Sequence, residues 1–398
     1  MSSRPLHALL LPPQAAAGRL LPALAAALDG TGPAILPLDP GLPRARVTAL
    51  LEAFAPTAVQ TPDGTRRRPG GVGVPDEVAV VIATSGSTGE PKAAQLTAAA
   101  MLHSARASLE RIAARPGGRW LCPLPTSHIA GLGVLVRSLV AGTQPVVTQR
   151  LTSADLAAGC GYVSLVPTQL RRLLAAGADL ASLEAILLGG AAIPAGLLAE
   201  ARAAGARVIT TYGMSETCGG CVYDGEPLAG VSVRTGSDGR IQLAGPVLFA
   251  GYRGRPDLTA QVLADGWFVT SDVGTVSGGR LTVRGRADEI ITTGGEKVAP
   301  AEVAAVLETC PAVAEAAVVG QPDPEWGQRV TAVVVPADPA APPSLGVLRE
   351  LVRERIASYA APRALVLVPA IPLLPSGKPD LAALRELSGP GNRGRAAE

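Results

Sequence analysis

The chain has 398 residues, 47% of them hydrophobic, which is enough to bury a large core and to form two or three domains. Its 35 basic and 33 acidic residues leave a net charge of +2, which gives no electrostatic footprint for nucleic acid or for an anionic membrane. Five cysteines in a chain of this length do not make a disulfide framework, so we expect a reducing, cytoplasmic location.

The predicted elements of the first half of the chain alternate between helices and strands. Apolar residues recur at helical spacing in 19–28 and 98–113, whereas the short apolar runs 78–83, 185–188 and 207–211 end in glycine or hydroxyl residues, as strands do. This alternation predicts an α/β fold of layered, largely parallel sheets. The longest apolar stretch that could span a membrane, 129–147, contains Arg137, so no stable membrane insertion is expected.

The pattern of predicted elements changes at two points in the second half of the chain. Residues 231–248, with turn signals at 236–239 and at Gly245-Pro246, predict antiparallel hairpins and hence a small β subdomain. Pro300 and Glu302 suit the first turn of a helix, and they are followed by strands near 313–319 and 329–335, a helix near 345–356 and a strand at 364–368. We therefore expect a large N-terminal domain over 1–287, a small α+β C-terminal domain over 288–388, and a disordered tail over 389–398.

The apolar run 78–83 ends in a loop suited to phosphate. Glycines let the backbone approach an oxyanion, hydroxyls donate hydrogen bonds, and a lysine adds positive charge; the residues concerned are Thr84, Ser85, Gly86, Ser87, Thr88, Gly89 and Lys92. The loop is not a Walker A motif, because Pro91 precedes the lysine and Ala93 follows it. Taken alone, the loop is equally compatible with a flexible Ser/Gly surface segment.

Five further motifs follow this loop. They are the segments 188–192 (LGGAA), 212–217 (YGMSET), 267–274 (WFVTSDVG), 285–297 (GRADEI with GGEK) and 375–378 (PSGK). Together with the phosphate loop, and in this order, they resemble the adenylate-forming superfamily of acyl- and aryl-CoA ligases, luciferases and peptide-synthetase adenylation domains. Cys218 and Cys221 have metal-ligand spacing, but no second cysteine pair or nearby histidine completes a zinc site.

The resemblance implies an enzyme that joins a carboxylic acid to AMP and then passes the acyl group to the thiol of CoA. The phosphate loop would cradle the β- and γ-phosphates of ATP, Glu216 would hold Mg²⁺, and Ser215 would reach the α-phosphate. Adenine would lie against Tyr212 and the glycine turn, and the ribose hydroxyls against Asp272 and Arg286. The turn and strand-end residues implied are Gly189, Gly190, Ala191 and Gly213.

The resemblance also assigns roles in the C-terminal domain. Lys378 would be the catalyst of adenylation, carried into the site by a mobile C-terminal domain. Asp288 would be its hinge, and Gly294 and Gly295 would line the channel for the pantetheine arm of CoA, where bare backbone is needed. Outside this family, a lysine on a Pro/Gly turn or a Gly-Gly pair would be an ordinary surface feature.

The acid is indicated by residues 123–142, PLPTSHIAGLGVLVRSLVAG. This phrase looks like the o-succinylbenzoate-CoA ligases of menaquinone biosynthesis in a short actinobacterial form, and the roughly 80 residues before the phosphate loop agree with a trimmed N-terminus. His128, as a catalytic or gating residue, and Arg137 are the candidates for the pocket that receives the second carboxylate. Ser215 stands where many members have threonine, which preserves the hydroxyl.

Three functions remain open from the sequence. The first is an o-succinylbenzoate-CoA ligase. The second is another acyl- or aryl-CoA ligase, or an enzyme that loads a carrier protein. The third is a non-catalytic nucleotide-binding regulator, which would not need Lys378, Glu216 and Asp272 together. The expected partners are a small carboxylic acid and CoA, and the chain is compatible with a homodimer.

Overall fold

The computed structural model describes residues 3–12, 15–85, 91–374 and 379–389. A first mixed sheet has the strand order β18-β8-β7-β3-β2-β4-β5, with its four central strands parallel and its edges antiparallel. Its strands are β2 (Leu6–Leu9), β3 (Ala34–Pro37), β4 (Ala58–Thr61), β5 (Gly64–Arg67), β7 (Val78–Ser85), β8 (Pro91–Thr97) and β18 (Gly251–Tyr252). A small pair, β1 (Ser3–Arg4) with β6 (Val74–Pro75), lies beside it.

A second mixed sheet has the order β10-β9-β11-β12-β13-β14-β15, in which the first five strands are parallel. Its strands are β9 (Trp120–Cys122), β10 (Val146–Val147), β11 (Tyr162–Leu165), β12 (Ala185–Leu188), β13 (Val208–Met214), β14 (Gly219–Tyr223) and β15 (Glu226–Pro227). The strands predicted at 185–188 and 207–211 are confirmed as β12 and β13. The side chains of β12 are all apolar and buried, as expected of a parallel strand covered on both faces, whereas β13 is buried only at Val208 and Ile209 and continues into half-buried Thr, Tyr and Gly residues.

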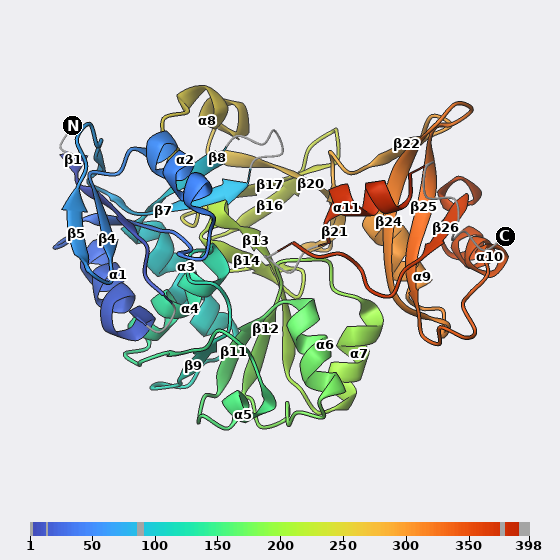
Figure 1. The fold of residues 1–398 in the computed structure, drawn as a ribbon, viewed down its shortest axis with the longest axis horizontal. Coiled ribbons are helices and arrows are strands. Elements are labelled where there is room, and N and C mark those ends of the chain that lie inside the picture. The colour runs from blue at the N-terminus through green and yellow to red at the C-terminus, as the bar shows by residue number, and fades with distance from the viewer. Residues whose placement is uncertain (1–2, 13–14, 86–90, 375–378, 390–398) are drawn as a thin grey trace.

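Helices fill the space between the two sheets and cover their outer faces (Figure 1). Residues of α1 (Leu21–Leu28), α3 (Ala98–Arg111) and α4 (Ile129–Val140) share one buried cluster with strands of both sheets, so these helices form the layer between them. The remaining elements are α2 (Arg44–Phe54), α5 (Ser153–Leu156), α6 (Pro167–Ala175), α7 (Ala195–Ala203) and a π-helical turn at Ala16–Leu20. None of the helices in the described residues is long and apolar enough to cross a membrane.

The β subdomain is a third sheet of β16 (Ser232–Thr235), β17 (Arg240–Ala244), β19 (Leu263–Ala264), β20 (Trp267–Ser277) and β21 (Arg280–Arg286). The predicted hairpin across 236–239 is confirmed as β16–β17. The hairpin expected after Gly245-Pro246 is wrong, because the chain leaves this sheet to form β18 and α8 (Pro256–Val262) before β20 pairs with β17. Val247 and Phe249 are 0% and 2% exposed, so burial in the main core outweighs local strand pairing there.

The C-terminal part is an α+β unit with its own buried clusters. Its elements are β22 (Ile291–Thr293), β23 (Glu296–Val298), α9 (Pro300–Leu307), β24 (Val313–Asp323), β25 (Gly327–Pro336), α10 (Leu345–Arg355), β26 (Ala364–Leu367) and α11 (Leu381–Leu387). The predicted helices and strands are confirmed, with β24 and β25 longer than expected. Helices α9 and α10 pack on one face of the sheet and α11 on the other.

The domain boundary at 288 stays a prediction; Asp288 lies between β21 and β22. Of the tail predicted to be disordered, only Gly389 lies within the described residues.

Candidate active site

The predicted nucleotide site begins at a glycine turn after β12. Gly189 and Gly190 follow β12, which runs parallel to β13 with Leu188 opposite Thr210. A Cβ at Gly189 would overlap the hydroxyl and carbonyl of Thr211, and Gly190 has a φ of +82°. These two positions therefore require glycine, and the turn with Ala191 lies at the carboxyl edge of the sheet, where open α/β folds bind ligands.

Tyr212 and Asp272 come together from two different sheets. The Tyr212 hydroxyl donates a 2.8 Å hydrogen bond to Asp272 Oδ2. Burial, followed by the charge of Asp272, raises the pKa of Tyr212 well above its usual range, so the phenol stays a neutral donor. The Asp272 side chain is 17% exposed, and its Oδ1 is not the oxygen that accepts from Tyr212. The pair joins the predicted adenine and ribose residues in one place.

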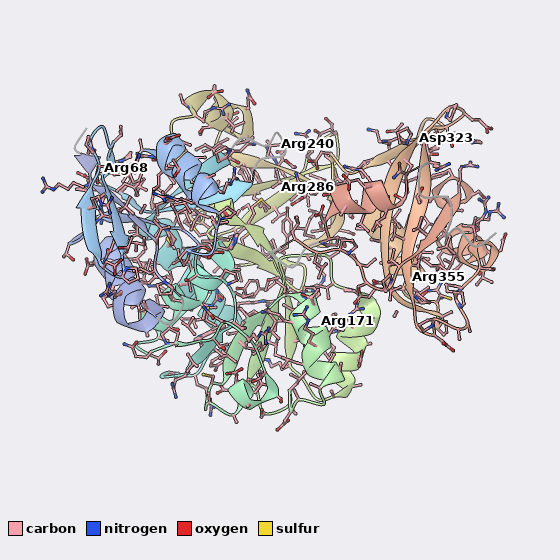
Figure 2. The ribbon with its side chains drawn as sticks, viewed as in Figure 1. Arg68, Arg171, Arg240, Arg286, Asp323 and Arg355 are labelled. Atoms are coloured by element: carbon pink, nitrogen blue, oxygen red, sulfur yellow. The ribbon has the colours of Figure 1, made fainter. Side chains whose placement is uncertain are left out.

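Arg286 links this pair to the predicted hinge. It lies opposite Asp272 in the β20–β21 ladder, with Nη1 4.0 Å from Asp272 Oδ1. Arg286 is labelled in Figure 2. Its Nε and Nη2 each donate a 2.9 Å hydrogen bond to the carboxylate of Asp288. Partial burial opposes ionisation of Asp288, but the hydrogen bonds and charge of Arg286 outweigh it and lower the pKa of this carboxyl. The Arg286 guanidinium therefore faces both Asp272, the carboxylate predicted to bind ribose, and Asp288, the predicted hinge.

Glu216 lies on a short 3₁₀ helix, Ser215–Thr217, that follows β13 directly. Its Oε1 accepts a 2.7 Å hydrogen bond from the Tyr252 hydroxyl, and its carbonyl accepts one of 2.9 Å from the Phe249 amide. Burial, then the charge of Glu216, raises the pKa of Tyr252 far above its usual range. Tyr252 was not among the predicted site residues, because Gly251-Tyr252 forms a strand of only two residues and gives no strand signal in the sequence.

Glycine is also required where β13 bends toward Glu216. The β13–β14 ladder shifts register between Tyr212 and Gly213, and a Cβ at Gly213 would overlap the carbonyl of Gly219. The bulge re-aims the chain after Tyr212. In the described residues, no group of three or more His, Cys, Asp or Glu side chains is placed to hold a metal ion. A single carboxylate such as Glu216 fits Mg²⁺, which is usually held by one or two carboxylates together with phosphates.

The phosphate loop connects β7 to β8, which pair as an antiparallel hairpin. Thr84 lies opposite Lys92, and its hydroxyl donates to the Lys92 carbonyl at 3.5 Å. The Lys92 ammonium lies 5.8 Å from the centroid of the Tyr252 ring. Gly86, Ser87, Thr88 and Gly89 lie outside the described residues, as does Lys378, and Ser85 is described only in its backbone.

Arg137 is largely buried on α4, between the two large sheets. Its guanidinium stacks 4.4 Å from the Trp120 ring, and Nη2 donates to Ser164 Oγ at 2.9 Å. Nε is buried and has no hydrogen-bond partner within the described chain. Burial lowers the pKa of Arg137, although an arginine remains charged at neutral pH. A buried cation with only neutral partners is costly unless something anionic joins it.

His128 and Arg137 do not converge on one point. His128 is exposed at the N-terminal cap of α4, and nine residues along a helix correspond to about 14 Å and a half-turn of rotation. A cavity of about 190 Å³ borders the loop before His128, but neither of the two predicted pocket residues lines it. The lining residues are Leu9, Leu11, Leu20, Pro37, Leu38, Asp39, Pro40, Pro123, Leu124, Pro125, Thr126, Ser127, Val147, Thr148 and Gln149.

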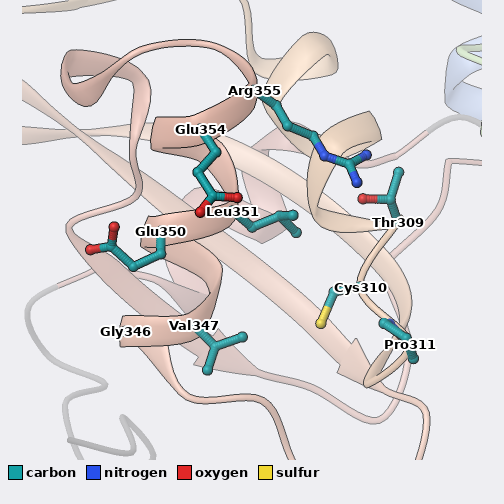
Figure 3. Close-up of a pocket in the computed structure, with 9 residues that line it drawn as sticks. All are labelled: Thr309, Cys310, Pro311, Gly346, Val347, Glu350, Leu351, Glu354 and Arg355. Carbon is teal, nitrogen blue, oxygen red and sulfur yellow. The ribbon is translucent and has the colours of Figure 1, made fainter.

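The two glycines predicted to line the channel for CoA belong to the C-terminal unit. Gly294 and Gly295, with φ of +58° and +85°, form the turn between β22 and β23, and Gly294 packs closely on Trp326. A separate hollow between the end of α9 and α10, about 630 Å³ in volume and bordered by Cys310 and Val347, holds none of the predicted site residues (Figure 3).

The C-terminal unit also touches α6 directly. Arg171 Nη1 lies 2.7 Å from Glu315 Oε1 and donates to the Ala314 carbonyl at 3.0 Å. Figure 2 labels Arg171 at α6. This contact joins the two predicted domains away from the predicted hinge at Asp288.

Comparisons with known proteins identify the family and the fold of the chain. The AMP-binding enzyme family matches residues 71–248, and the AMP-binding enzyme C-terminal domain matches 302–378. A probable 2-succinylbenzoate–CoA ligase of Mycobacterium tuberculosis is 43% identical over 397 residues, covering 95% of this chain and 97% of the relative. The 2-succinylbenzoate–CoA ligase of Salmonella typhimurium is 35% identical, covering 84% and 78%. The structure of o-succinylbenzoate CoA synthetase from Bacillus subtilis, in complex with the acyl-adenylate intermediate OSB-AMP, has a TM-score of 0.81 and 28% identity over 96% of this chain and 88% of that one.

Proposed function

The chain belongs to the AMP-binding family of adenylate-forming enzymes and is an acid–CoA ligase, and we propose that its acid is 2-succinylbenzoate. In the first half-reaction, a carboxylate oxygen attacks the α-phosphorus of ATP, and pyrophosphate leaves with the electrons of the broken bond. In the second, the sulfur of CoA attacks the acyl carbonyl, loses its proton to solvent, and displaces AMP. The protein mainly positions the reactants and stabilises charge on the phosphates.

The nucleotide would bind across the carboxyl ends of β12 and β13. Asp272 uses Oδ2 to accept from Tyr212 and keeps Oδ1 for the ribose hydroxyls, beside Arg286. The turn at Gly189 and Gly190 leaves backbone accessible to the adenine. Tyr212, pinned through its hydroxyl, presents a ring held in one orientation. These contacts would fix the α-phosphate in line with the attacking acid.

Glu216 would hold Mg²⁺ through the carboxylate oxygen that Tyr252 does not occupy. When bound, Mg²⁺ neutralises charge that develops on the phosphates. Thr84, Ser85 and Lys92 stand at the ends of β7 and β8, where the phosphate loop begins and ends. Lys378 would add a point charge between acid and phosphate, delivered by a C-terminal domain that turns about Asp288. Gly294 and Gly295 would face the thiol arm after that turn.

The observation that carries the choice of acid is the buried charge of Arg137. Its contacts are an aromatic ring and a hydroxyl, and no acidic side chain in the described chain neutralises it. 2-Succinylbenzoate has a second carboxylate besides the one that is activated, and this group would complete the site. Monocarboxylic acids would leave the guanidinium uncompensated. We place the aromatic carboxylate at Arg137, and His128 at the entrance to the pocket.

The test is pyrophosphate release with a panel of acids under identical conditions. 2-Succinylbenzoate is expected to react far faster than benzoate, medium-chain fatty acids or amino acids. Equal rates with a simple fatty acid would remove the dicarboxylate assignment and favour another acyl-CoA ligase. Replacing CoA with a phosphopantetheinyl carrier protein separates the two acceptors, and CoA is expected to be the faster one.

A further inference from the structure

Tyr252 lies between the two charged groups expected to meet the phosphates of ATP. Its hydroxyl donates to Glu216 Oε1 at 2.7 Å, and the Lys92 ammonium lies 5.8 Å from its ring centroid. Lys92 leads out of the phosphate loop on β8, whereas Glu216 follows β13 in the other large sheet. One aromatic side chain therefore joins two sheets at the point where ATP would bind.

The backbone around Tyr252 is fixed from several directions. Tyr252 pairs with Ala94 of β8, and its amide donates to Thr259 Oγ1 at 2.8 Å. Gly251 has a φ of +137° and approaches Thr259 so closely that a Cβ there would lie 2.8 Å from its methyl group. Strand β18 is therefore held against both β8 and α8.

The ring of Tyr252 is held as firmly as its backbone. The residue is 8% exposed and packs edge to face on Phe249, with centroids 4.9 Å apart. Phe249 in turn donates its amide to the Glu216 carbonyl at 2.9 Å. The segment from Phe249 to Tyr252 thus donates hydrogen bonds to Glu216 at both its main-chain carbonyl and its carboxylate.

We propose that Tyr252 is a positioning residue for adenylation, which orients the Glu216 carboxylate for Mg²⁺·ATP and aligns it with Lys92 at the mouth of the phosphate loop. This inference rests on the metal role proposed for Glu216. A glutamate side chain has three rotatable bonds, and Mg²⁺ requires near-ideal octahedral geometry, so a carboxylate held in advance binds it better than a freely rotating one. A tyrosine has a single hydroxyl proton, and donating it to Oε1 leaves Oε2 for the metal.

The direct test is Tyr252→Phe, which removes the hydroxyl and keeps the ring under Lys92. Binding of a non-hydrolysable ATP analogue is measured by calorimetry across a series of Mg²⁺ concentrations. The Mg²⁺ concentration for half-maximal binding is expected to rise about 10-fold or more, as when the hydrogen-bond partner of a metal ligand is lost. Thioester formation from pre-made acyl-AMP and CoA is expected to be unchanged.

Tyr162→Phe is the matched control. Tyr162 is also a buried tyrosine that donates to a glutamate, Glu184 Oε2 at 2.5 Å, but this pair lies away from the nucleotide site. Its loss is expected to affect thermal stability without moving the Mg²⁺ dependence. A comparable Mg²⁺ shift in both variants would show a general packing effect and overturn the inference.

A double-mutant cycle with Glu216→Gln separates this inference from the proposed function. If Tyr252 acts through Glu216, Tyr252→Phe should shift the Mg²⁺ dependence strongly in the wild type and little in the Glu216→Gln background. If Glu216→Gln shifts the dependence and Tyr252→Phe, still folded by its melting curve, does not, the inference fails and the metal role stands. If Glu216→Gln has no effect, the metal role itself fails, and the inference falls with it.

Phe249→Leu tests the same idea while retaining the hydroxyl. It loosens the packing of the Tyr252 ring without deleting the hydrogen-bond donor. A shift in Mg²⁺ dependence smaller than that of Tyr252→Phe is expected. A larger shift than Tyr252→Phe would show that the ring packing, and not the hydroxyl, controls Glu216, and would overturn the proposal.

Discussion

Replacing Arg137 with methionine should separate stability from substrate recognition. The substitution keeps an unbranched apolar stem and removes the charge. It loses the stacking on Trp120, worth up to about 2 kcal/mol when desolvated, and a charged hydrogen bond to Ser164, worth about 1.5–3 kcal/mol. Against this, it removes the desolvation penalty of a buried guanidinium, which is several kcal/mol. These contributions nearly cancel, so the free energy of unfolding should change by no more than about 2 kcal/mol.

The effect on catalysis should be much larger. Breaking a buried charge pair costs about 3–5 kcal/mol, so kcat/KM for 2-succinylbenzoate should fall roughly 10²-fold or more in Arg137→Met. Rates with monocarboxylic acids, although low, should not fall. Arg137→Lys should lose less of kcat/KM for 2-succinylbenzoate than Arg137→Met does, because an ammonium keeps the charge but not the planar geometry of the guanidinium.

Two assays decide the question: urea unfolding for stability, and pyrophosphate release for kcat/KM. A loss of more than about 3 kcal/mol in the free energy of unfolding of Arg137→Met, with the preference for 2-succinylbenzoate unchanged, would refute a role of Arg137 in recognising the acid. That outcome would make Arg137 a structural cation that organises Trp120 and Ser164.

The remaining predictions concern the C-terminal domain. Lys378→Ala should slow adenylation ~10²-fold or more while leaving thioester formation from acyl-AMP near the wild-type rate, and an equal loss in both steps would contradict the proposed domain rotation. Arg171→Ala removes a partly exposed ion pair to Glu315, so adenylation should slow by no more than about 5-fold, whereas the control Arg172→Ala, exposed on the same helix, should not change it. The pKa of Asp288 is lowered in the folded state, so its carboxylate should stabilise the protein fully above about pH 4, and this stabilisation should be lost as the pH falls through the folded-state pKa. The difference in free energy of unfolding between the wild type and Asp288→Asn, measured by urea unfolding, should therefore shrink at low pH. A constant difference from pH 7 to pH 3 would contradict this.

Local sequence patterns predicted much of the fold because helices and strands with one buried face place apolar residues at regular intervals along the sequence. Strand β12, predicted at 185–188, and helix α9, predicted from Pro300, both agree with their local signals. The second hairpin failed because Gly245-Pro246 marks a chain reversal but does not specify which strand comes next. Val247 and Phe249 are buried in the main core, and the second partner of β17, besides β16, is β20, which begins at Trp267.

The motifs of the site were predicted from the sequence, but the side-chain contacts between them were not. Tyr212 and Asp272 are 60 residues apart, and Tyr252 lies 36 residues after Glu216, so no local spacing relates either pair. The resemblance of residues 123–142 made His128 and Arg137 candidates for one pocket, yet helical geometry separates the cap residue His128 from Arg137 by about 14 Å and a half-turn of rotation. Long-range contacts depend on how sheets and helices pack, which a single sequence does not reveal.

The central claim is tested most directly by incubating the purified protein with 2-succinylbenzoate, ATP, Mg²⁺ and CoA and identifying the products by mass spectrometry. The account predicts 2-succinylbenzoyl-CoA, AMP and pyrophosphate in equal amounts, and, when CoA is omitted, exchange of labelled pyrophosphate into ATP that depends on the acid. Formation of ADP, or the absence of acid-dependent exchange in a folded protein, would contradict it.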